Sequence, residues 1–460
     1  MSVIALDIGT TRLCVLAMDE DTGVVLEILS SRNAFLPQDH PWERMQDPLR
    51  IYELSETMIS KLIKKYSPVR CIGISGQMHG ILYIDSAGKA LSPLYTWQDQ
   101  RSALPFREGK SYTEYLASLS RGSIAPGYGL ATYFYHASTG SVPSGTAAIC
   151  TIGDYLAMGL CRSSKAVIHT TNACGFGFFD VPGRVFDTAA LEAGGIDPSI
   201  LPDISAGSET LGETPEGIPV SVAIGDNQAS FLGALGDSGS DILINIGTGS
   251  QISFVCGNIK NYRGLELRPF FEDRFLLVGA SLCGGRAYAL LENFFREVLK
   301  MAGYSHESPL YPFMDSLVSA GENKNPLLVN TLFEGTREDP SLRGWIQNIS
   351  ESNFTPANLA AGFLEGIACE LYRLYQPVLE YKKHERLVGS GNGVRKNRPL
   401  QQILSKKFCM PLEVPLYTEE AASGAAFFAL LCTGYLKDIS QTRNLIRYKK
   451  TEEIRKSEVP

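Results

Sequence analysis

The chain of 460 residues has few histidines and tryptophans, six and three respectively. Its histidines show none of the short spacings typical of a metal site, and no two of its ten cysteines form a Cys-x-x-Cys pair. Most of the cysteines lie in apolar stretches, which favours buried thiols in a reducing compartment. These absences exclude a disulfide framework and a cysteine-rich zinc site, and they predict a cytoplasmic protein.

Long apolar runs and an excess of positive charge are also missing. The longest nearly apolar segment, residues 421–432, is far shorter than the ~20 residues that cross a bilayer. No basic stretch followed by an apolar one opens the chain, so we expect no signal peptide and no membrane partner. Lysine and arginine number 42 against 49 acidic residues, a net charge of −7, which argues against a nucleic-acid partner. The basic stretch 443–456 contains two glutamates and is interpreted as a solvated terminal helix.

What is present is the composition of a large folded protein. Hydrophobic residues make up 44% of the chain and charged residues 20%, which excludes bulk disorder. The 44 glycines and 24 prolines follow no period, which excludes collagen-like sequence. At roughly 100–200 residues per domain, the length predicts two to four domains with a substantial core.

The sequence contains an internal repeat. Residues 4–18 read IALDIGTTRLCVLAM, and residues 242–256 read ILINIGTGSQISFVC. Each segment is an apolar strand, then a polar residue followed by Ile-Gly-Thr, then a second strand, so each predicts a β-hairpin with a glycine turn. Because the two copies stand at the starts of the two halves, we interpret them as the mark of a duplication.

Further elements indicate a layered α/β organisation. Short strands that run into glycine-containing loops are expected at 70–75, 91–96, 220–224 and 386–388. Helices are expected at 48–66, 285–301, 356–379, 398–408 and 419–431. Strands that lead into glycine loops with helices after them are typical of α/β folds. The small, polar stretch 235–240 places the domain boundary, giving domains 1–236 and 237–460.

The two glycine turns carry groups that suit phosphate. In Asp7-Ile8-Gly9-Thr10-Thr11, the glycine lets backbone N–H groups approach an anion and the hydroxyls can donate to its oxygens. The Asp7 carboxylate can hold Mg²⁺ through water, and Arg12 could add positive charge. Gly247-Thr248-Gly249 offers the same cradle in the other half. Two ordinary hairpin turns are the alternative, but the duplicated pair favours a nucleotide triphosphate site.

Polar residues at other strand ends suit a polyol. Gln77 and His79 follow the strand at 70–75, and Trp97 with Asp99 offers an aromatic platform and a carboxylate near Arg101. Satisfied polar groups in ordinary loops remain the alternative. Asp226 directly follows another apolar strand, where it could be a helix N-cap or a base that takes a proton from a substrate hydroxyl.

These motifs together resemble the FGGY family of carbohydrate kinases over nearly the whole chain. The first phosphate motif corresponds to Asp7-x-Gly9-Thr10-Thr11, and the second to 245–249. The ketose-binding region corresponds to 76–80 and 97–99, the catalytic aspartate segment to 225–229, and the adenosine loop to 389–392. Among its members the sedoheptulokinases are the most similar, because of residues 127–132, and the xylulokinases are next.

The resemblance implies the fold and the site. The fold would be α/β, with duplicated ribonuclease H-like domains around a central cleft, as in actin, hexokinase and Hsp70. ATP would phosphorylate the terminal hydroxyl of a ketose, with Asp226 as general base and Mg²⁺ held by Asp7 and Asp226 through water. The sugar-binding residues would be Gln77, Met78, His79, Trp97, Asp99, Asp226 and Asn227. The ATP-binding residues would be Gly9, Thr10, Thr11, Arg12, Gly247, Thr248, Gly249, Gly284, Gly389, Ser390, Gly391 and Asn392.

Two departures bear on the sugar. The adenosine loop reads Gly-Ser-Gly-Asn-Gly-Val where xylulokinases usually have a glycine triplet with Ala-Lys-Ser, and Trp97-Gln98-Asp99 replaces their Trp-Asn-Asp. Xylulose or another ketose or polyol therefore stays open as the acceptor. A chaperone-like ATPase and a non-catalytic sugar- and nucleotide-binding protein of the same fold are alternatives from other classes. The sequence also leaves a homodimer open.

Overall fold

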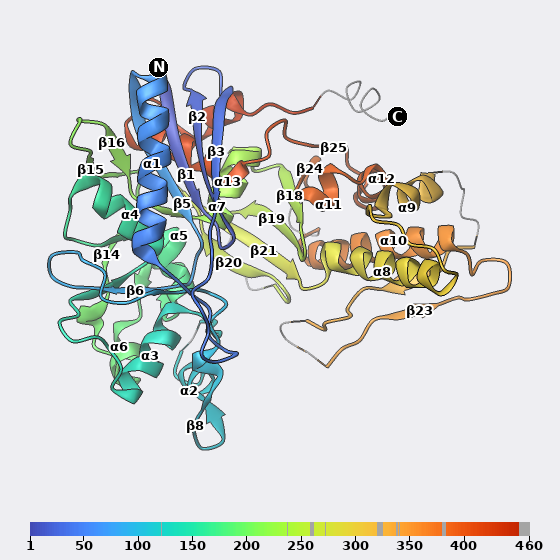
Figure 1. Ribbon diagram of the computed structural model, residues 1–460, viewed down its shortest axis with the longest axis horizontal. Coiled ribbons are helices and arrows are strands. Elements are labelled where there is room, and N and C mark those ends of the chain that lie inside the picture. The colour runs from blue at the N-terminus through green and yellow to red at the C-terminus, as the bar shows by residue number, and fades with distance from the viewer. Residues whose placement is uncertain are drawn as a thin grey trace. The chain divides into compact units, whose positions relative to one another are not determined.

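A computed structural model gives the fold of the chain (Figure 1). It describes residues 1–449 except 121, 237, 258–261, 272, 320–324, 337–338, 340 and 380–382. The chain forms two compact units, each assembled from separate segments. The first contains 1–237, 268–275 and 419–446, and the second contains 238–267, 276–418 and 447–460. Two short segments from the second half of the sequence are thus part of the first unit.

The first unit is built on a seven-stranded mixed sheet. Its strand order is β15 (Thr210–Glu213), β16 (Pro219–Ser221), β5 (Val69–Gly76), β1 (Ser2–Ile8), β2 (Arg12–Asp19) and β3 (Val25–Arg32), and β17 (Ile224–Gly225) also pairs with β5. β1 and β2 form the antiparallel hairpin that the sequence predicts, while β5 and β17 run parallel to β1. The carboxyl ends of β1, β5 and β17 consequently meet at one edge of the sheet.

Helices cover both faces of this sheet. On one face, α1 (Pro48–Tyr66) and α4 (Ile152–Cys161) pack on alternate residues of the central strands. α1 begins where Asp47 caps the amides of Leu49 and Arg50, with Pro48 in its first turn. On the other face lie α7 (Asp226–Leu235) and α13 (Glu420–Cys432). Their axes come close because glycines face the neighbouring backbone at the crossing, Gly233 on α7 and Gly424 on α13.

A separate apolar cluster supports the loops and short elements beside this sheet. The helices there are α2 (Tyr112–Ala117), α3 (Gly129–Thr139), α5 (Thr170–Ala173) and α6 (Thr188–Ala193). The strands are β4 (Met45–Gln46), β6 (Leu82–Ile84), β7 (Leu94–Tyr95), β8 (Pro105–Arg107), β9 (Lys110–Ser111), β10 (Ala148–Cys150), β11 (Val167–His169), β12 (Phe179–Asp180), β13 (Val185–Phe186) and β14 (Asp203–Ser205).

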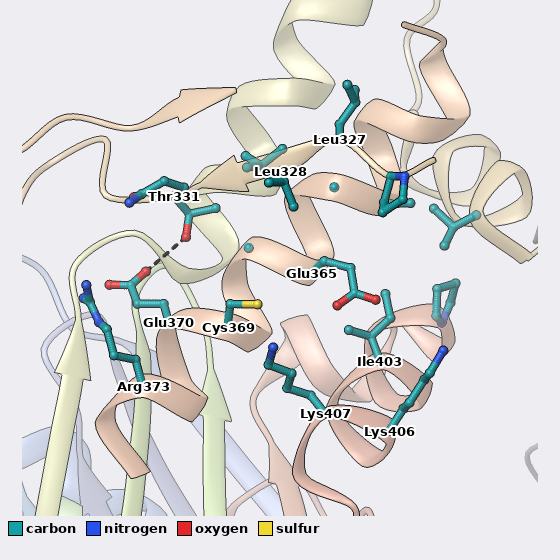
Figure 2. A pocket seen from close by; sticks show the side chains of 18 of the residues that line it. Leu327, Leu328, Thr331, Glu365, Cys369, Glu370, Arg373, Ile403, Lys406 and Lys407 are labelled. Atoms are coloured by element: carbon teal, nitrogen blue, oxygen red, sulfur yellow. Dashed lines mark hydrogen bonds between the residues drawn. The ribbon is translucent and has the colours of Figure 1, made fainter. Parts of the chain in front are cut away.

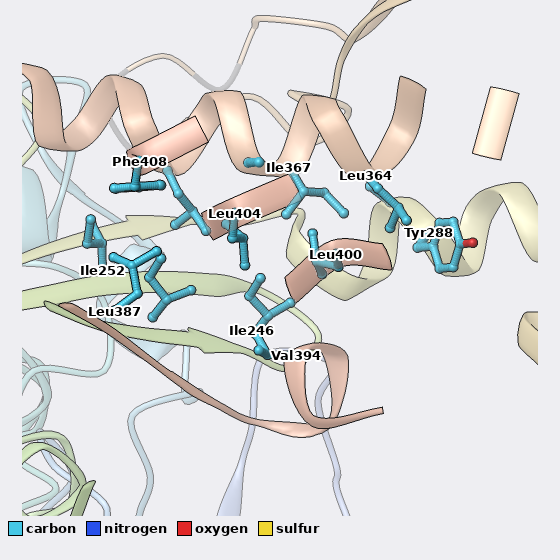
Figure 3. Close-up of a cluster of buried hydrophobic side chains, with 14 of the residues drawn as sticks. Ile246, Ile252, Tyr288, Leu364, Ile367, Leu387, Val394, Leu400, Leu404 and Phe408 are labelled. Atoms are coloured by element: carbon cyan, nitrogen blue, oxygen red, sulfur yellow. The ribbon is translucent and has the colours of Figure 1, made fainter. Parts of the chain in front are cut away.

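The second unit contains most of a six-stranded sheet. Its order is β20 (Glu266–Pro269), β21 (Phe275–Ser281), β19 (Ser250–Cys256), β18 (Asp241–Ile246), β24 (Arg386–Ser390) and β25 (Leu412–Glu413). The helices are α8 (Gly284–Met301), α9 (Tyr311–Ser319), α10 (Pro356–Tyr375), α11 (Asn392–Arg395) and α12 (Arg398–Phe408), beside the hairpin β22 (Leu328–Asn330) and β23 (Trp345–Gln347). Figure 3 shows their core, in which Leu364 and Ile367 of α10 and Leu404 of α12 pack over strand residues such as Ile246.

The two sheets share the layout that the internal repeat predicts. In the first, Asp7 lies opposite Cys14 in the hairpin and opposite Ser75 in the parallel strand β5. In the second, Asn245 lies opposite Gln251 in the hairpin and opposite Ser390 in the parallel strand β24. A hairpin beside a parallel strand, with its polar residues at equivalent positions, therefore occurs once in each unit.

Some expected elements are corrected by the structure. The expected strand 91–96 is reduced to β7, because Pro93 cannot donate to a ladder. The expected terminal helix at 443–456 is wrong for its described part: residues 443–445 end a 3₁₀ helix, and Tyr448 forms an isolated bridge with Pro415. Residues 450–456 lie outside the described residues. Within the described part of the chain, no helix has both the length and the apolar character to span a membrane.

Candidate active site

Three parallel strand ends place the chemical groups of the first unit. Asp7 lies at the end of β1, Gln77 directly follows β5, and Asp226 directly follows β17. The pairing is tight, with Ile224 opposite Ser75 and Gly225 opposite Gly76. Because carboxyl ends of parallel strands are where α/β sheets bind ligands, this edge is the candidate site of the first unit.

The Asp7 side chain is anchored by a hydrogen bond from the neighbouring strand. The Ser75 hydroxyl donates a hydrogen bond of 2.8 Å to Asp7 Oδ1. Burial, together with the nearby charge of Asp226, raises the pKa of Asp7 to about 7. Two carboxylates are therefore close enough to repel one another at this edge of the sheet.

Asp226 opens α7 and lies in its first turn. A carboxylate there is favoured by the helix dipole. Burial raises the pKa of Asp226 to about 6, and the Arg268 guanidinium opposes that increase. Arg268 comes from the 268–275 segment, which packs on α7 through a 3.2 Å hydrogen bond from Gln228 Nε2 to the Pro269 carbonyl. A carboxylate with this pKa is largely ionised at neutral pH and can accept a proton.

The first hairpin turn is tight and partly exposed. The Gly9 amide donates to the Arg12 carbonyl at 3.0 Å, and a Cβ on Gly9 would lie 2.9 Å from that oxygen, so glycine is required by the close approach. Thr10 and Thr11 stand at the tip and are half-buried and exposed. Arg12 forms an ion pair with Glu419, the residue before α13.

A hydrogen-bonded network joins this turn to the expected sugar loop. Thr10 Oγ1 donates to Gln77 Oε1 at 3.3 Å, and Gln77 Nε2 donates to Gln46 Oε1 at 2.8 Å. Gln46 Nε2 in turn donates to the Thr10 carbonyl at 2.7 Å, and Trp97 Nε1 donates to Thr10 Oγ1 at 2.9 Å. The predicted residues Thr10, Gln77 and Trp97 are thus brought together, with the fully buried Gln46 as a member that the motifs did not indicate.

Met78 and His79 continue the loop after β5. Met78 is buried, and its sulfur lies 2.9 Å from where a Cβ on Gly225 would be, so the residue before Asp226 must be small. His79 has a positive φ of 74°. Its ring stacks on Tyr128 with centroids 4.5 Å apart, and its Nδ1 lies 3.0 Å from the Gly175 carbonyl. Tyr128 belongs to the 127–132 stretch on which the sedoheptulokinase resemblance rests.

Asp99 is engaged by an arginine fork. Arg101 donates from Nε to Asp99 Oδ1 at 2.7 Å and from Nη2 to Oδ2 at 3.0 Å, and the Arg44 amide donates to Oδ2 at 3.0 Å. The carboxylate is fully buried. This geometry supports a role in holding the loop that carries Trp97.

Asn227 follows Asp226 and offers a buried acceptor. Its Oδ1 has no hydrogen-bond partner among the described residues. Leaving a buried acceptor without a partner costs about 1–3 kcal/mol, so such an atom beside Asp226 points to a ligand hydroxyl or amide.

In the second unit the predicted residues gather around its own hairpin turn. Gly247 N donates to the Gly249 carbonyl at 3.0 Å, and the amides of Gly285 and Arg286 donate to the carbonyls of Gly247 and Thr248 at 3.0 and 2.9 Å. The first turn of α8 therefore packs on the tip. A Cβ on Gly284 would lie 2.5 Å from the Gly249 carbonyl carbon, so glycine permits this approach.

The expected adenosine loop lies at the end of the neighbouring strand. Gly389 and Ser390 end β24, and Asn392 begins α11. Gly391 has a φ of +76°, and a Cβ there would lie 2.5 Å from the Ile246 carbonyl oxygen, which explains the need for glycine. Ser390 Oγ is buried without a partner among the described residues.

The carboxylates fit a divalent cation only in part. Asp7 and Asp226 supply negative charge whose mutual repulsion a bound cation would relieve. Within the described residues, no three His, Cys, Asp or Glu side chains cluster as a metal site. Two carboxylates suit Mg²⁺, which keeps several waters and takes its other ligands from phosphate oxygens.

The residues that motifs missed share one feature. Gln46, Arg268 and Glu419 are distant in the sequence from the residues that they contact, and none belongs to a glycine-containing motif. Only the requirement that buried charges find partners could have suggested Arg268 and Glu419, without saying which partners.

Comparison with known proteins identifies the family of the chain. The N-terminal domain of the FGGY family of carbohydrate kinases matches residues 2–237, and its C-terminal domain matches 244–432. A mouse (Mus musculus) sedoheptulokinase is 29% identical over 443 residues, covering 87% of this chain and 88% of the relative. The expected kinase assignment is confirmed by these matches.

Solved structures show the same fold. The xylulose kinase from Rhodospirillum rubrum has a TM-score of 0.85 at 20% identity, covering 98% of this chain and 93% of that one. The glycerol kinase of Plasmodium falciparum with ADP has a TM-score of 0.80 at 21% identity, covering 99% and 96%. The expected actin- and hexokinase-like two-domain α/β fold is confirmed. Because the two family domains span nearly its whole length, the chain belongs to the FGGY family of carbohydrate kinases and is an ATP-dependent sugar phosphotransferase.

Proposed function

We propose that this kinase transfers the γ-phosphoryl group of ATP to the terminal hydroxyl of a ketose, with sedoheptulose as the preferred acceptor. The observation that carries the proposal is the position of Asp226, in the first turn of α7 at the strand edge that also presents Asp7 and Gln77. A polyol bound by the loops at this edge would lie beside the Asp226 carboxylate.

Asp226 accepts the proton of the acceptor hydroxyl. Its pKa of about 6 leaves the carboxylate mostly ionised near neutral pH, while remaining close enough to that pH for efficient transfer. The Arg268 cation favours the ionised form, since it opposes the effect of burial.

The phosphate groups are bound by backbone at the glycine turns. In the first unit the donors are at Gly9, Thr10 and Thr11, with Arg12 nearby but paired to Glu419. In the second unit they are at Gly247, Thr248 and Gly249, with the first turn of α8 at Gly284. Helix N-termini and glycine turns are suited to anions. Adenosine binds at the loop formed by Gly389, Ser390, Gly391 and Asn392, where the Ser390 hydroxyl can donate a hydrogen bond.

The sugar is bound by the loops after β5 and β17. Asn227 Oδ1 accepts a hydrogen bond from a sugar hydroxyl. Trp97, which is 43% exposed, supplies a ring face for the sugar to contact. Gln77 and Asp99 hold the loops in place, because their polar atoms are engaged by Thr10, Gln46 and Arg101. Met78 and the stacked pair of His79 and Tyr128 shape the wall.

Mg²⁺, when bound through water to Asp7 and Asp226, would neutralise charge on the transferring phosphates. The chain's own part is to hold these two carboxylates near one another. Ser75 fixes the first by its hydrogen bond, and the start of α7 fixes the second.

Sedoheptulose is favoured over other acceptors by two lines of support. The mouse sedoheptulokinase shares 29% identity over most of both chains, and His79 stacks on Tyr128 in the stretch that favours this subfamily. Xylulose and glycerol are the alternatives, since structures titled xylulose kinase and glycerol kinase share the fold.

The role of Asp226 is tested by Asp226→Asn. We expect kcat to fall ~10²–10⁴-fold with the fold intact, because the amide cannot take the proton. Asp39→Asn is the matched control, since Asp39 is an exposed aspartate of the same unit. A near-parental kcat in the Asp226 variant would show that this carboxylate is not the base.

The acceptor is tested by ADP release with sedoheptulose, D-xylulose, D-ribulose and glycerol under one condition. We expect sedoheptulose to give the highest kcat/KM, and glycerol to be poor because it leaves polar groups of the site unpaired, a penalty that can reach ~10⁴-fold. Glycerol in first place would contradict the ketose assignment. Xylulose in first place would keep the mechanism and overturn the preference for sedoheptulose.

A further inference from the structure

A groove with the dimensions of a ligand site lies in the second unit, beside α10 (Figure 2). It has a volume of about 980 Å³, within the range typical of small-molecule sites. β22, α10 and α12 form its walls. None of the residues proposed to bind ATP lines it, so the groove is separate from the site described above.

The groove is a built feature of this unit. Two glycines of α10 let β22 approach the helix: a Cβ on Gly366 would lie 2.6 Å from the Val329 carbonyl oxygen, and one on Gly362 would lie 2.8 Å from the Val329 side chain. The strand is therefore held against one side of α10. α12 packs on the same helix, and the groove lies between the two contacts.

Three cations line the groove. They are Arg373 on α10 and Lys406 and Lys407 on α12. No carboxylate of the described residues comes within ion-pairing distance of any of them, and Lys407 Nζ lies 5.6 Å from the centroid of the Tyr372 ring. Three positive charges thus lie along the groove beside two carboxylates, Glu365 and Glu370, and none of the three forms an ion pair with a described residue.

The two carboxylates of the groove are in different situations. Glu370 already accepts a hydrogen bond of 3.0 Å from Thr331 Oγ1. Glu365 points into the groove from α10, opposite Lys407, and burial raises its pKa against the pull of the two lysines. A half-buried carboxylate without a hydrogen-bond donor from the described residues is an acceptor for hydroxyl groups.

We propose that this groove binds a small phosphorylated polyhydroxy compound, such as a sugar phosphate, at a site separate from the catalytic one. The phosphate would pair with Lys406, Lys407 and Arg373, which outnumber the carboxylates. Glu365 would accept hydroxyl hydrogen bonds, and Leu328 with Ile403 would contact the C–H surface of the ligand. A neutral polyol would leave the cations unused, and inorganic phosphate would leave most of the volume and Glu365 unused.

Two exposed thiols give an internal test. Cys369 lines the groove, whereas Cys409, at the end of α12, does not, and both are exposed. The rate at which iodoacetamide alkylates each is followed by mass spectrometry with and without glucose 6-phosphate. We expect the ligand to slow the reaction of Cys369 several-fold and to leave that of Cys409 unchanged, because only the first would be covered.

Variants then test the assigned groups. Lys406→Gln combined with Lys407→Gln should weaken the protection of Cys369 at least about tenfold in ligand concentration, since charge-assisted contacts to phosphate are lost. Glu365→Gln should weaken it less, because an amide still accepts a hydrogen bond. Lys300→Gln, an exposed lysine of the same unit on α8, is the control and should change nothing. Kinase activity of all three variants should remain parental, which shows that they fold.

Several results would overturn the proposal. Equal protection of Cys369 by inorganic phosphate, by glucose or by ADP would assign the groove to that ligand instead of a sugar phosphate. Absence of protection by glucose 6-phosphate, or protection that survives the double lysine substitution, would show that the groove is not this binding site. Because the readout is local to Cys369, these results are independent of how the catalytic site performs.

Discussion

The Ser75 hydroxyl donates a 2.8 Å hydrogen bond to the carboxylate of Asp7, across two parallel strands in register. The same register in the second unit places Ser390 opposite Asn245. In the first unit the serine stabilises a charged group, because it opposes the effects of burial and of Asp226 on Asp7. Of the two equivalent positions, 7 and 245, only the first therefore carries a carboxylate.

Ser75→Ala should reduce both stability and turnover. A hydrogen bond to a charged group contributes about 1.5–3 kcal/mol, so we expect a loss of that order in the free energy of unfolding measured in urea, with a lower kcat. Ser55→Ala is the matched control, because Ser55 is equally buried but its hydroxyl has no partner among the described residues. Equal stability losses in the two variants would contradict the importance of the Asp7 contact.

Gly424→Ala should strongly destabilise the first unit. A Cβ on Gly424 would lie 1.9 Å from the Ala229 carbonyl oxygen, where α13 crosses α7, and neither backbone can move without separating the helices. We expect a loss of at least about 2 kcal/mol in the free energy of unfolding, or failure to fold. Gly257→Ala is the control, since its added Cβ would meet nothing within 4 Å. A Gly424→Ala protein of parental stability would show that this helix crossing is looser than described.

The elements that the sequence predicts best are those with local signals at both ends. α1 has the expected limits because Asp47 and Pro48 open it, and α12 has the expected limits because Asn397 caps it and Pro399 lies in its first turn. The two hairpins were predictable because glycine turns separate apolar strands. β7 is shorter than expected because Pro93 interrupts its ladder, a local signal that the hydrophobic pattern alone does not take into account.

The candidate site was predictable only where it follows strand ends. Asp7, Gln77 and Asp226 stand at such ends, and the parallel register brings them together. Arg268 was not predictable, because it belongs to the 268–275 segment that returns to the first unit from the second half of the sequence. Gln46 was not predictable, because its partners Thr10 and Gln77 are distant from it in the sequence. The engagement of Asp99 by Arg101 agrees with the carboxylate and guanidinium pair noted in the sequence, while its second donor, the Arg44 amide, has no sequence signal.

A buried histidine should contribute a loss of stability in mild acid, opposite in sign to the contributions of Asp7 and Asp226, whose raised pKa values favour the folded protein as pH falls. Burial and the Arg101 cation lower the pKa of His136 from 6.5 to about 3. In the unfolded chain this ring takes up a proton below about pH 6.5, whereas in the folded protein it stays neutral, so stability is lost as pH falls. We expect His136 alone to contribute a loss of about 2 kcal/mol between pH 7 and pH 5.

Urea unfolding at several pH values measures this loss. His136→Gln removes the titrating ring, so its free energy of unfolding minus that of the parent should increase by about 2 kcal/mol from pH 7 to pH 5, even though the variant is less stable at pH 7. The comparison of slopes separates titration from the lost contacts with Arg101 and Tyr83. Parallel curves for the two proteins would contradict the assignment of the acid loss to this histidine.

Thr248→Val should impair the use of ATP more than that of the sugar. Thr248 stands exposed at the tip of the second hairpin, and its carbonyl accepts the Arg286 amide at 2.9 Å, so the turn is held while the hydroxyl remains available to phosphate. Valine keeps the branched shape and removes only the hydroxyl, which donates to an anionic oxygen. We expect the KM for ATP to rise about tenfold, as for one lost hydrogen bond to a charged group, and the KM for the sugar to change little.

Thr57→Val on the exposed face of α1 is the control and should leave both constants unchanged. Kinetics with each substrate varied in turn decide the matter: a raised KM for the sugar with an unchanged KM for ATP would remove Thr248 from the phosphate site, whereas equal increases in both would point to a general distortion of the turn.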